Sequence, residues 1–251
     1  MATKKIGLQI YSIRDIYFKN PREAFKVIKD AGYDAVDMFG NIIMPAEELK
    51  ALLDEFGLEC CGWHTPGEYW GKKDILEAFV SYNKIIGNKY LIIPGLPGNY
   101  TKDSAAWLEA AKKINEIAAQ LKVHGMYTGM HSHAVEFKPT DGSDELPWDI
   151  IAKNTCEDVV LQLDMGNTEH AGVDSVEVLK KYKNRYRTIH LKPFSKTKGF
   201  APPIGEDDID WADVIKYCNE NGNTEYFIVE YEEENAKEGI KACIDNLKKY
   251  L

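Results

Sequence analysis

Short apolar runs alternate with longer amphipathic stretches along the whole chain. The short runs are rich in β-branched and aromatic residues and are bounded by turn-forming residues, which is typical of buried parallel strands. We predict strands over residues 5–11, 35–39, 59–64, 90–94, 126–131, 159–163, 188–191 and 225–229. The longer stretches carry apolar residues three and four positions apart, which indicates helices with one buried face. We predict these helices over residues 21–31, 45–56, 74–86, 103–121, 147–154, 175–182, 211–221 and 235–250.

Residues that favour helix ends and turns divide these elements. Asn20 stands at the N-cap position of the first predicted helix, and Gly57 follows the end of the second. We predict loops over residues 12–20, 67–71 and 192–210. The second loop contains Tyr69 and Trp70, which are suited to covering a ligand. The third is rich in Pro, Gly and Lys and is long enough to predict a functional loop or lid.

Eight strand and helix units in 251 residues predict a closed (β/α)8 TIM barrel of the α/β class. An open doubly wound sheet usually carries a glycine-rich phosphate loop after its first strand, and the sequence has none after Tyr11. No linker divides the chain, so we expect a single domain over residues 1–251. In such a barrel, residues that end the strands face the mouth in which active sites lie.

The net charge of the chain indicates which classes of binding partner are disfavoured. A net charge of -9 and an isoelectric point near 5.3 argue against nucleic acid, because phosphate backbones are bound by clusters of Lys and Arg. Nothing in the sequence predicts a membrane span, and the N-terminal apolar run is too short for a signal peptide, so we expect a cytoplasmic protein. The five Cys are odd in number and scattered, which predicts neither a disulfide framework nor a zinc motif. The oligomeric state stays open, a homo-oligomer included.

Metal-ligating side chains end four successive predicted strands. They are His131, Asp164, His190 and Glu230. One such residue alone usually caps a turn or is hydrogen-bonded in place, but neighbouring strands of a barrel would aim all four at one point. Imidazoles and carboxylates without a thiolate suit Mn, Mg, Zn or Co. The sequence therefore predicts a divalent metal centre at the barrel mouth.

Other polar residues near these strand ends are candidates for contact with a substrate. Asn167 and His170 lie about one turn after Asp164, where they are placed to orient its carboxylate or to contact substrate. Lys192 lies two residues beyond the histidine of the seventh strand and on the same face of an extended chain. It is placed to stabilise an enolate or to pair with Glu230.

Longer motifs surround the predicted ligands. They are LQIYSIRD at residues 8–15, LDMGN at 163–167, HLKP at 190–193, IGEDDIDW at 204–211 and IVEYE at 228–232. These segments resemble the sugar phosphate isomerase/epimerase group of xylose isomerase-like barrels over nearly the whole chain. The resemblance implies a divalent metal, often Mn, held by Glu, Asp, His and Glu at the ends of strands five to eight. It assigns three of these places to Asp164, His190 and Glu230, and matches His64 to a position that contacts substrate hydroxyls.

The fifth strand departs from the motif. In the segment GMHSHAVEF, at residues 129–137, His131 aligns with the usual first Glu, and the His pair before Glu-Phe resembles a variant within the group. In the epimerases of the group that Glu also acts as an acid/base, a role that a metal-bound imidazole fills less readily. Whether His131 or Glu136 is the fourth ligand stays open. The candidates for the catalytic proton shuttle are Glu230, His133 and Glu136.

Together these observations predict a metal-dependent isomerase or epimerase of a sugar, polyol or sugar phosphate that moves a proton through an enediolate. The resemblance favours Mn, with Mg, Co or Zn as alternatives. A dehydratase or keto-sugar lyase is the main alternative, because a His/Glu site can remove a proton beside a ketone without returning it to the same carbon. An abasic-site endonuclease is disfavoured by the net charge and the six His. A non-catalytic sugar-binding barrel is the last alternative.

Overall fold

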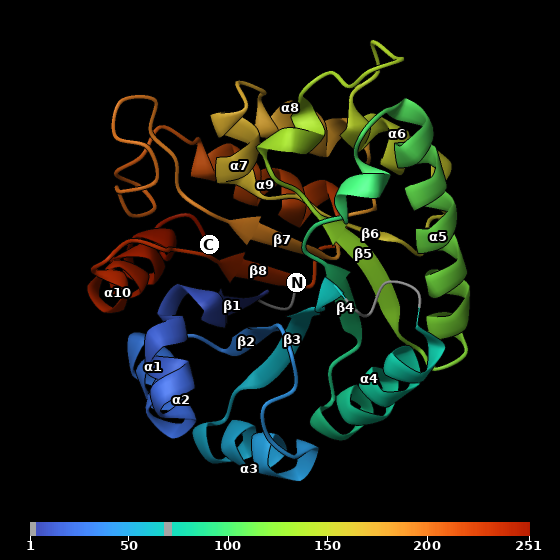
Figure 1. The fold of residues 1–251 in the computed structure, drawn as a ribbon. Helices are drawn as coiled ribbons and strands as arrows, with labels where there is room; N and C mark the ends of the chain where they lie inside the picture. Colours follow the sequence, from blue (N-terminus) through green and yellow to red (C-terminus); the bar gives the residue numbers. More distant parts are fainter. Residues whose placement is uncertain (1–3, 68–71) are drawn as a thin grey trace.

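The computed structural model describes residues 4–67 and 72–251, and its centre is a barrel of eight parallel strands (Figure 1). The strands are β1 (Lys5–Gln9), β2 (Ala35–Phe39), β3 (Glu59–His64), β4 (Tyr90–Ile93), β5 (Tyr127–His131), β6 (Val160–Gln162), β7 (Thr188–Leu191) and β8 (Tyr226–Val229). Their hydrogen-bonded order is β6-β5-β4-β3-β2-β1-β8-β7. The ring closes between β6 and β7, where N of His190 donates to O of Leu163 at 2.9 Å. The predicted TIM barrel is confirmed.

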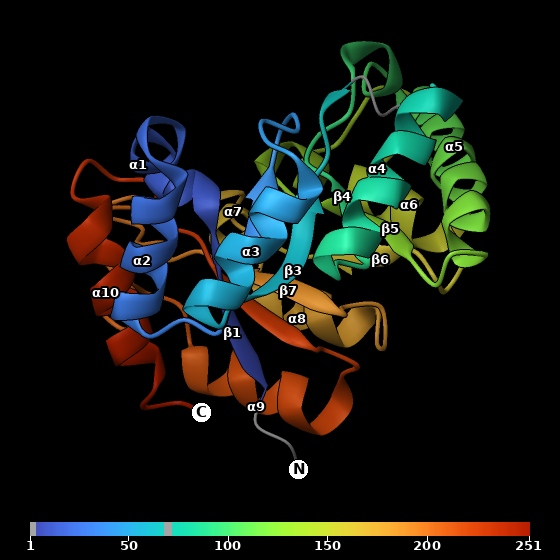
Figure 2. The same ribbon diagram turned by 90° about the horizontal axis from the view of Figure 1, so that it is seen from below.

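Helices surround the barrel and bury their apolar faces against its outer surface (Figure 1), and Figure 2 gives a second view. They are α1 (Arg14–Lys19), α2 (Pro21–Ala31), α3 (Ala46–Phe56), α4 (Lys73–Ile86), α5 (Ser104–Lys122), α6 (Pro147–Asn154), α7 (Met165–His170), α8 (Ser175–Lys181), α9 (Trp211–Asn221) and α10 (Ala236–Leu247). Short 3-10 helices are η1 (Ile10–Ile13), η3 (Gly98–Tyr100) and η4 (Ala134–Phe137). No helix of the described residues is long and apolar enough to cross a membrane.

The inside of the barrel changes from apolar to polar along the strands. Because successive side chains of a strand point to opposite faces, every second residue faces the interior. Ala35, Cys61 and Ile228 pack together in one interior layer. Nearer the carboxyl ends, the buried side chains are Gln9, Asp37, His64, His131, Gln162 and His190. A layer of buried polar groups, each of which requires a partner, therefore lies below the barrel mouth.

The prediction of a loop over residues 12–20 is wrong. The first strand ends at Gln9, whose Oε1 accepts a hydrogen bond from N of Tyr11 at 3.1 Å, and η1 and α1 follow at once. Ile13 and Tyr17 are buried four residues apart, with charged residues between them. This is the spacing of an amphipathic helix, and the polar composition of the segment concealed it.

Two further short helices lie outside the predicted elements. The residues after Asp164 form α7, and η4 interrupts the loop after β5. Tyr69 and Trp70, which were expected to cover a ligand, lie outside the described residues. Residues 192–210 are a loop as predicted, and Asp207 fixes it because its carboxylate accepts hydrogen bonds from N of Phe194 and Nε1 of Trp211.

Candidate metal centre

The four predicted ligands meet at the carboxyl end of the barrel. His131 is the last residue of β5, His190 lies in β7, and Asp164 and Glu230 follow β6 and β8 within two residues. All four are buried, and one possible ligand atom from each lies within 4.8 Å of those of the others. Strands far apart in the sequence therefore form one group of imidazole nitrogens and carboxylate oxygens.

Hydrogen bonds fix the backbone N and one carboxylate oxygen of Asp164, while its other carboxylate oxygen has no hydrogen-bond partner. Its N donates to Oγ of Ser132 at 2.9 Å, and its Oδ1 caps α7 by accepting from N of Asn167 at 2.7 Å. Its Oδ2 is buried and has no hydrogen-bond partner. Burial raises the pKa of Asp164 to about 7, although Lys192 opposes that shift. A buried carboxylate oxygen without a partner fits a bound cation.

Gly166 allows α7 to begin close to the end of β7. A Cβ at this position would lie 2.6 Å from O of Lys192, which is closer than real side chains approach a carbonyl. The turn from β6 into α7 therefore needs glycine, and it sets the distance between Asp164 and the His190 strand.

His190 lies between two carboxylates. Its Nδ1 is 2.6 Å from Oε2 of Glu230, and its Nε2 is 3.0 Å from Oδ2 of Asp37. Burial opposes protonation of His190, but the hydrogen bonds to Asp37 and Glu230 outweigh it and raise its pKa to about 9. Burial would also raise the pKa of Glu230, but Lys192 and His190 hold it well below its ordinary value.

The side-chain amide of Gln162 orients the ring of His131. Its Nδ1 is 3.1 Å from Oε1 of Gln162, and its Nε2 is 3.9 Å from Oδ2 of Asp164. Burial and the neighbouring imidazoles lower its pKa well below the ordinary value, so the ring is neutral. A neutral imidazole that donates from Nδ1 presents a lone pair at Nε2, as a metal ligand requires.

These donors fit a divalent ion. Two imidazoles and two carboxylates, one of them with an unpartnered oxygen, form a nitrogen and oxygen set of the kind that binds Mn, Co or Zn. The group contains His131 and not Glu136, among the residues that the structure describes. Glu136 is buried in η4, where its Oε2 accepts from N of His133 at 2.7 Å, and burial raises its pKa to about 7.

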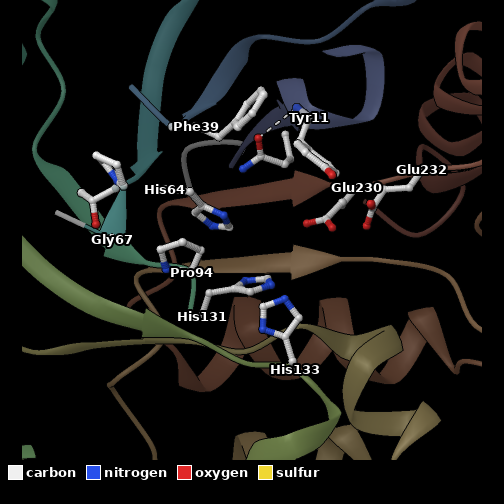
Figure 3. A pocket seen from close by; sticks show the side chains of 13 residues that line it. Tyr11, Phe39, His64, Gly67, Pro94, His131, His133, Glu230 and Glu232 are labelled. Atoms are coloured by element: carbon white, nitrogen blue, oxygen red, sulfur yellow. Dashed lines mark hydrogen bonds between the residues drawn. The ribbon is translucent and has the colours of Figure 1, made fainter. Parts of the chain in front are cut away.

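A cavity of about 450 Å³ opens beside this group (Figure 3). Its lining includes the apolar side chains of Tyr11, Phe39 and Pro94, with imidazoles and carboxylates between them. His133 and Glu230 both line it, together with Glu232. Desolvation lowers the pKa of His133 to about 4, helped by nearby imidazoles and Lys192, so this ring is neutral near pH 7. A cavity of this size with a mixed apolar and polar lining suits a ring-sized polyol.

Residues 25–250 match the family described as xylose isomerase-like TIM barrels. The chain belongs to this family. An inosose dehydratase from Clostridium perfringens is 30% identical over 162 residues, which cover 57% of this chain and 53% of that protein. The chain thus spans about half the length of the curated relatives that it matches.

Solved structures share the xylose isomerase-like fold over nearly the full length. A sugar phosphate isomerase/epimerase from Parabacteroides distasonis has a TM-score of 0.83 at 22% identity, covering 98% of each chain. A structure described as IOLI protein with a binding zinc atom has a TM-score of 0.73 at 13% identity, covering 98% of this chain and 99% of that one. At these identities the likeness establishes the fold alone.

The residues predicted to contact substrate occupy different surroundings in this xylose isomerase-like barrel. His64 lines the cavity. Lys192 is buried and donates to Glu230 at 2.8 Å and to Glu232, which is the pairing that its position in the sequence suggested. Asn167 is buried behind Asp164 and donates from Nδ2 to O of Ser132 at 3.2 Å. His170 is exposed and packs against Phe194 and Phe200, away from the cavity lining.

Sequence reasoning missed a second set of polar residues. Asp37, Gln162 and Gln9 are buried around the histidines, and none of them was a candidate. Gln162 accepts from both His131 and His64, and donates from Nε2 to Oγ1 of Thr188 at 3.0 Å. A signal was available, because a carboxylate or amide inside an otherwise apolar strand is unusual without a partner.

Proposed function

We propose that this barrel binds a divalent ion and removes the proton beside the carbonyl of a polyhydroxy ketone, with loss of water from the neighbouring carbon. The observation that carries the proposal is the position of neutral His133, which lines the same cavity as His131 and Glu230, two members of the buried group that also contains Asp164 and His190. A proton acceptor and an electron-withdrawing centre are the two requirements for breaking such a C–H bond.

Each step of the proposed reaction is assigned to a different residue. When bound, a divalent ion polarises the carbonyl and lowers the pKa of the adjacent C–H group. His133 takes the proton, and the ammonium of Lys192, which contacts Glu230 and Glu232, stabilises the negative charge that develops. Glu232 lines the cavity, and burial and the neighbouring Glu230 raise its pKa, so its protonated form supplies a proton to the departing hydroxyl as the C–O bond breaks and water leaves. The product is an unsaturated ketone with an enol hydroxyl, or its diketone tautomer.

The contacts of His131 favour elimination over epimerisation. Its Nδ1 is engaged by Gln162 and its Nε2 faces Asp164, so neither nitrogen is available to return a proton to a substrate carbon. Epimerisation requires a second acid/base on the opposite face of that carbon, whereas elimination does not. The likeness to inosose dehydratases at 30% identity supports the same reaction class.

Isomerisation through an enediolate is the second candidate function. Glu230 and His133 both line the cavity, so a proton taken from one carbon can be returned to its neighbour without a second base on the far side. The first step is the same as in elimination, and the fate of the hydroxyl distinguishes the two reactions.

Proton NMR of turnover in D2O tests both candidates. The chain is loaded with Zn²⁺ or Mg²⁺, which do not broaden the spectrum, and offered an inosose and open-chain keto sugars. Loss of water with a new vinylic or enol signal supports elimination. Deuterium incorporation with an intact set of hydroxyl-bearing carbons supports isomerisation instead. If the metal-loaded protein exchanges no C–H proton in any of these substrates, both candidates are rejected.

A further inference from the structure

Asp37 is a fully buried carboxylate within β2, on the side of His190 opposite Glu230. Its Oδ2 lies 3.0 Å from Nε2 of His190 and accepts from Nε2 of Gln9 at 3.0 Å. Its Oδ1 is buried without a partner. A buried charge of this kind is costly to the fold unless its partners hold it, so its contacts indicate its role.

The local fold makes room for this carboxylate. The register between β2 and β3 shifts between Val36 and Asp37, so that Asp37 pairs with Gly62. A Cβ on Gly62 would lie 2.5 Å from Oδ1 of Asp37, which is too close for an undisturbed carboxylate. The irregularity and the glycine together place Asp37 against the imidazole of His190.

Asp37 is not placed to act as a ligand or to contact substrate. It contacts the Nε2 edge of His190, while Glu230 contacts the Nδ1 edge, so an ion held with Glu230 lies on the far side of the ring. Asp37 also lies outside the lining of the cavity. Its remaining close neighbour is His64, whose Nε2 is 3.6 Å from Oδ2 of Asp37.

We infer that Asp37 is a positioning residue for the metal centre: it accepts the Nε2 proton of His190 and thereby fixes the tautomer and ring orientation that present Nδ1 as a ligand beside Glu230. Gln9 holds the carboxylate in place from the neighbouring strand. Carboxylate partners of this kind commonly change metal affinity by about 10- to 100-fold when removed. The inference rests on the proposed metal-dependent function.

Two variants alter this contact in different ways. Asp37→Asn keeps the size of the side chain but can turn either its oxygen or its amide toward Nε2, so the tautomer of His190 is no longer fixed. Gly62→Ala keeps every polar group and displaces Asp37 by contact with its Oδ1. Matched controls are Asp34→Asn, at an exposed residue just before β2, and Gly95→Ala, where an added Cβ meets nothing within 4 Å.

The affinity of the full chain for Zn²⁺ is measured by competition with a chromophoric chelator, and folding is checked by thermal melting. Both variants are expected to bind Zn²⁺ about 10- to 100-fold more weakly than the wild type, and both controls within about twofold of it. Wild-type affinity in folded Asp37→Asn or Gly62→Ala, or equal losses in the controls, would overturn the inference. If the wild type itself binds no Zn²⁺, it is the proposed function that fails.

A measurement on the unmodified protein decides the case even if the variants do not fold. Nitrogen-15 NMR of the Zn²⁺-loaded wild type reports which ring nitrogen of His190 carries the proton. We expect the proton on Nε2 and the metal on Nδ1. The opposite assignment, with the metal on Nε2, would show that Asp37 does not fix the ligand in this way.

Discussion

Lys192 donates a hydrogen bond of 2.8 Å to Oε1 of Glu230, while Oε2 of the same carboxylate lies 2.6 Å from Nδ1 of His190. One carboxylate thus joins a buried ammonium to a proposed metal ligand. The ammonium and a metal ion both neutralise Glu230, so removing either should make the protein depend more on the other.

Lys192→Met is therefore expected to make the fold depend on metal. Without its partner, buried Glu230 is left beside Asp164, and the metal-free protein should lose on the order of 3 kcal/mol of unfolding free energy. A divalent ion supplies the missing positive charge, so its addition should raise the melting temperature more in the variant than in the wild type. Thermal melting with EDTA and with Zn²⁺ measures this. Equal metal-induced shifts in the two proteins would argue against shared neutralisation.

Asp164→Asn should separate stability from metal binding. The folded-state pKa of about 7 lies above that of an unfolded Asp, so the charged form destabilises the metal-free fold as pH rises toward 7. At pH 8 with EDTA, the variant should therefore be more stable than the wild type by on the order of 2 kcal/mol. It should also lose Zn²⁺ binding and turnover. Chelator competition and urea unfolding measure the two effects, and retained Zn²⁺ affinity would remove Asp164 from the ligand set.

His133→Asn should lower turnover without releasing metal. His133 lines the cavity but lies outside the group of four ligands, so the loss of its proton transfer should reduce kcat by about 10²- to 10⁴-fold. Zn²⁺ affinity should stay within about twofold of the wild type. A lower kcat with unchanged Zn²⁺ affinity would exclude His133 as a metal ligand. An unchanged kcat would show that another residue is the base.

Because of Glu136, the free energy of unfolding should fall as the pH rises from about 4.5 to about 7. The folded-state pKa of this carboxyl, about 7, exceeds its unfolded value, so the native state binds more protons in this window and loses stability as pH rises through it. Glu136→Gln should flatten this part of the profile, by on the order of 3 kcal/mol across the window. Urea unfolding of both proteins at several pH values measures the difference. Parallel profiles would contradict the protonated, buried state.

The site residues that could be predicted from the sequence are those located at the ends of strands. His131, Asp164, His190 and Glu230 could be found because a barrel brings the ends of successive strands together, whatever the details of packing. Asp37 could not be placed in the same way. It lies inside β2 and not at a strand end, and the local sequence does not specify the register shift that sets Gly62 of β3 opposite it.

Helices and strands were predicted correctly where the apolar positions recur with a clear period over a long enough segment. Short helices with few apolar residues were missed. Segment α1 is brief, half of its residues are charged, and Tyr17 is the buried residue within it. Segment α7 begins at Met165, separated from β6 by two residues, with Asp164 as its N-cap, and its Gly166 and Asn167 are residue types that also favour turns. Both short helices lie at the barrel mouth, where the proposed function places its chemistry.

We propose that His131, Asp164, His190 and Glu230 together hold one divalent ion. Crystals grown with Zn²⁺ or Mn²⁺ and measured at the absorption edge of the metal test it most directly. We expect one anomalous peak in contact with Nε2 of His131, Oδ2 of Asp164, Nδ1 of His190 and Oε2 of Glu230. Absence of a peak at saturating metal, or an ion bound to Glu136 in place of His131, would contradict it.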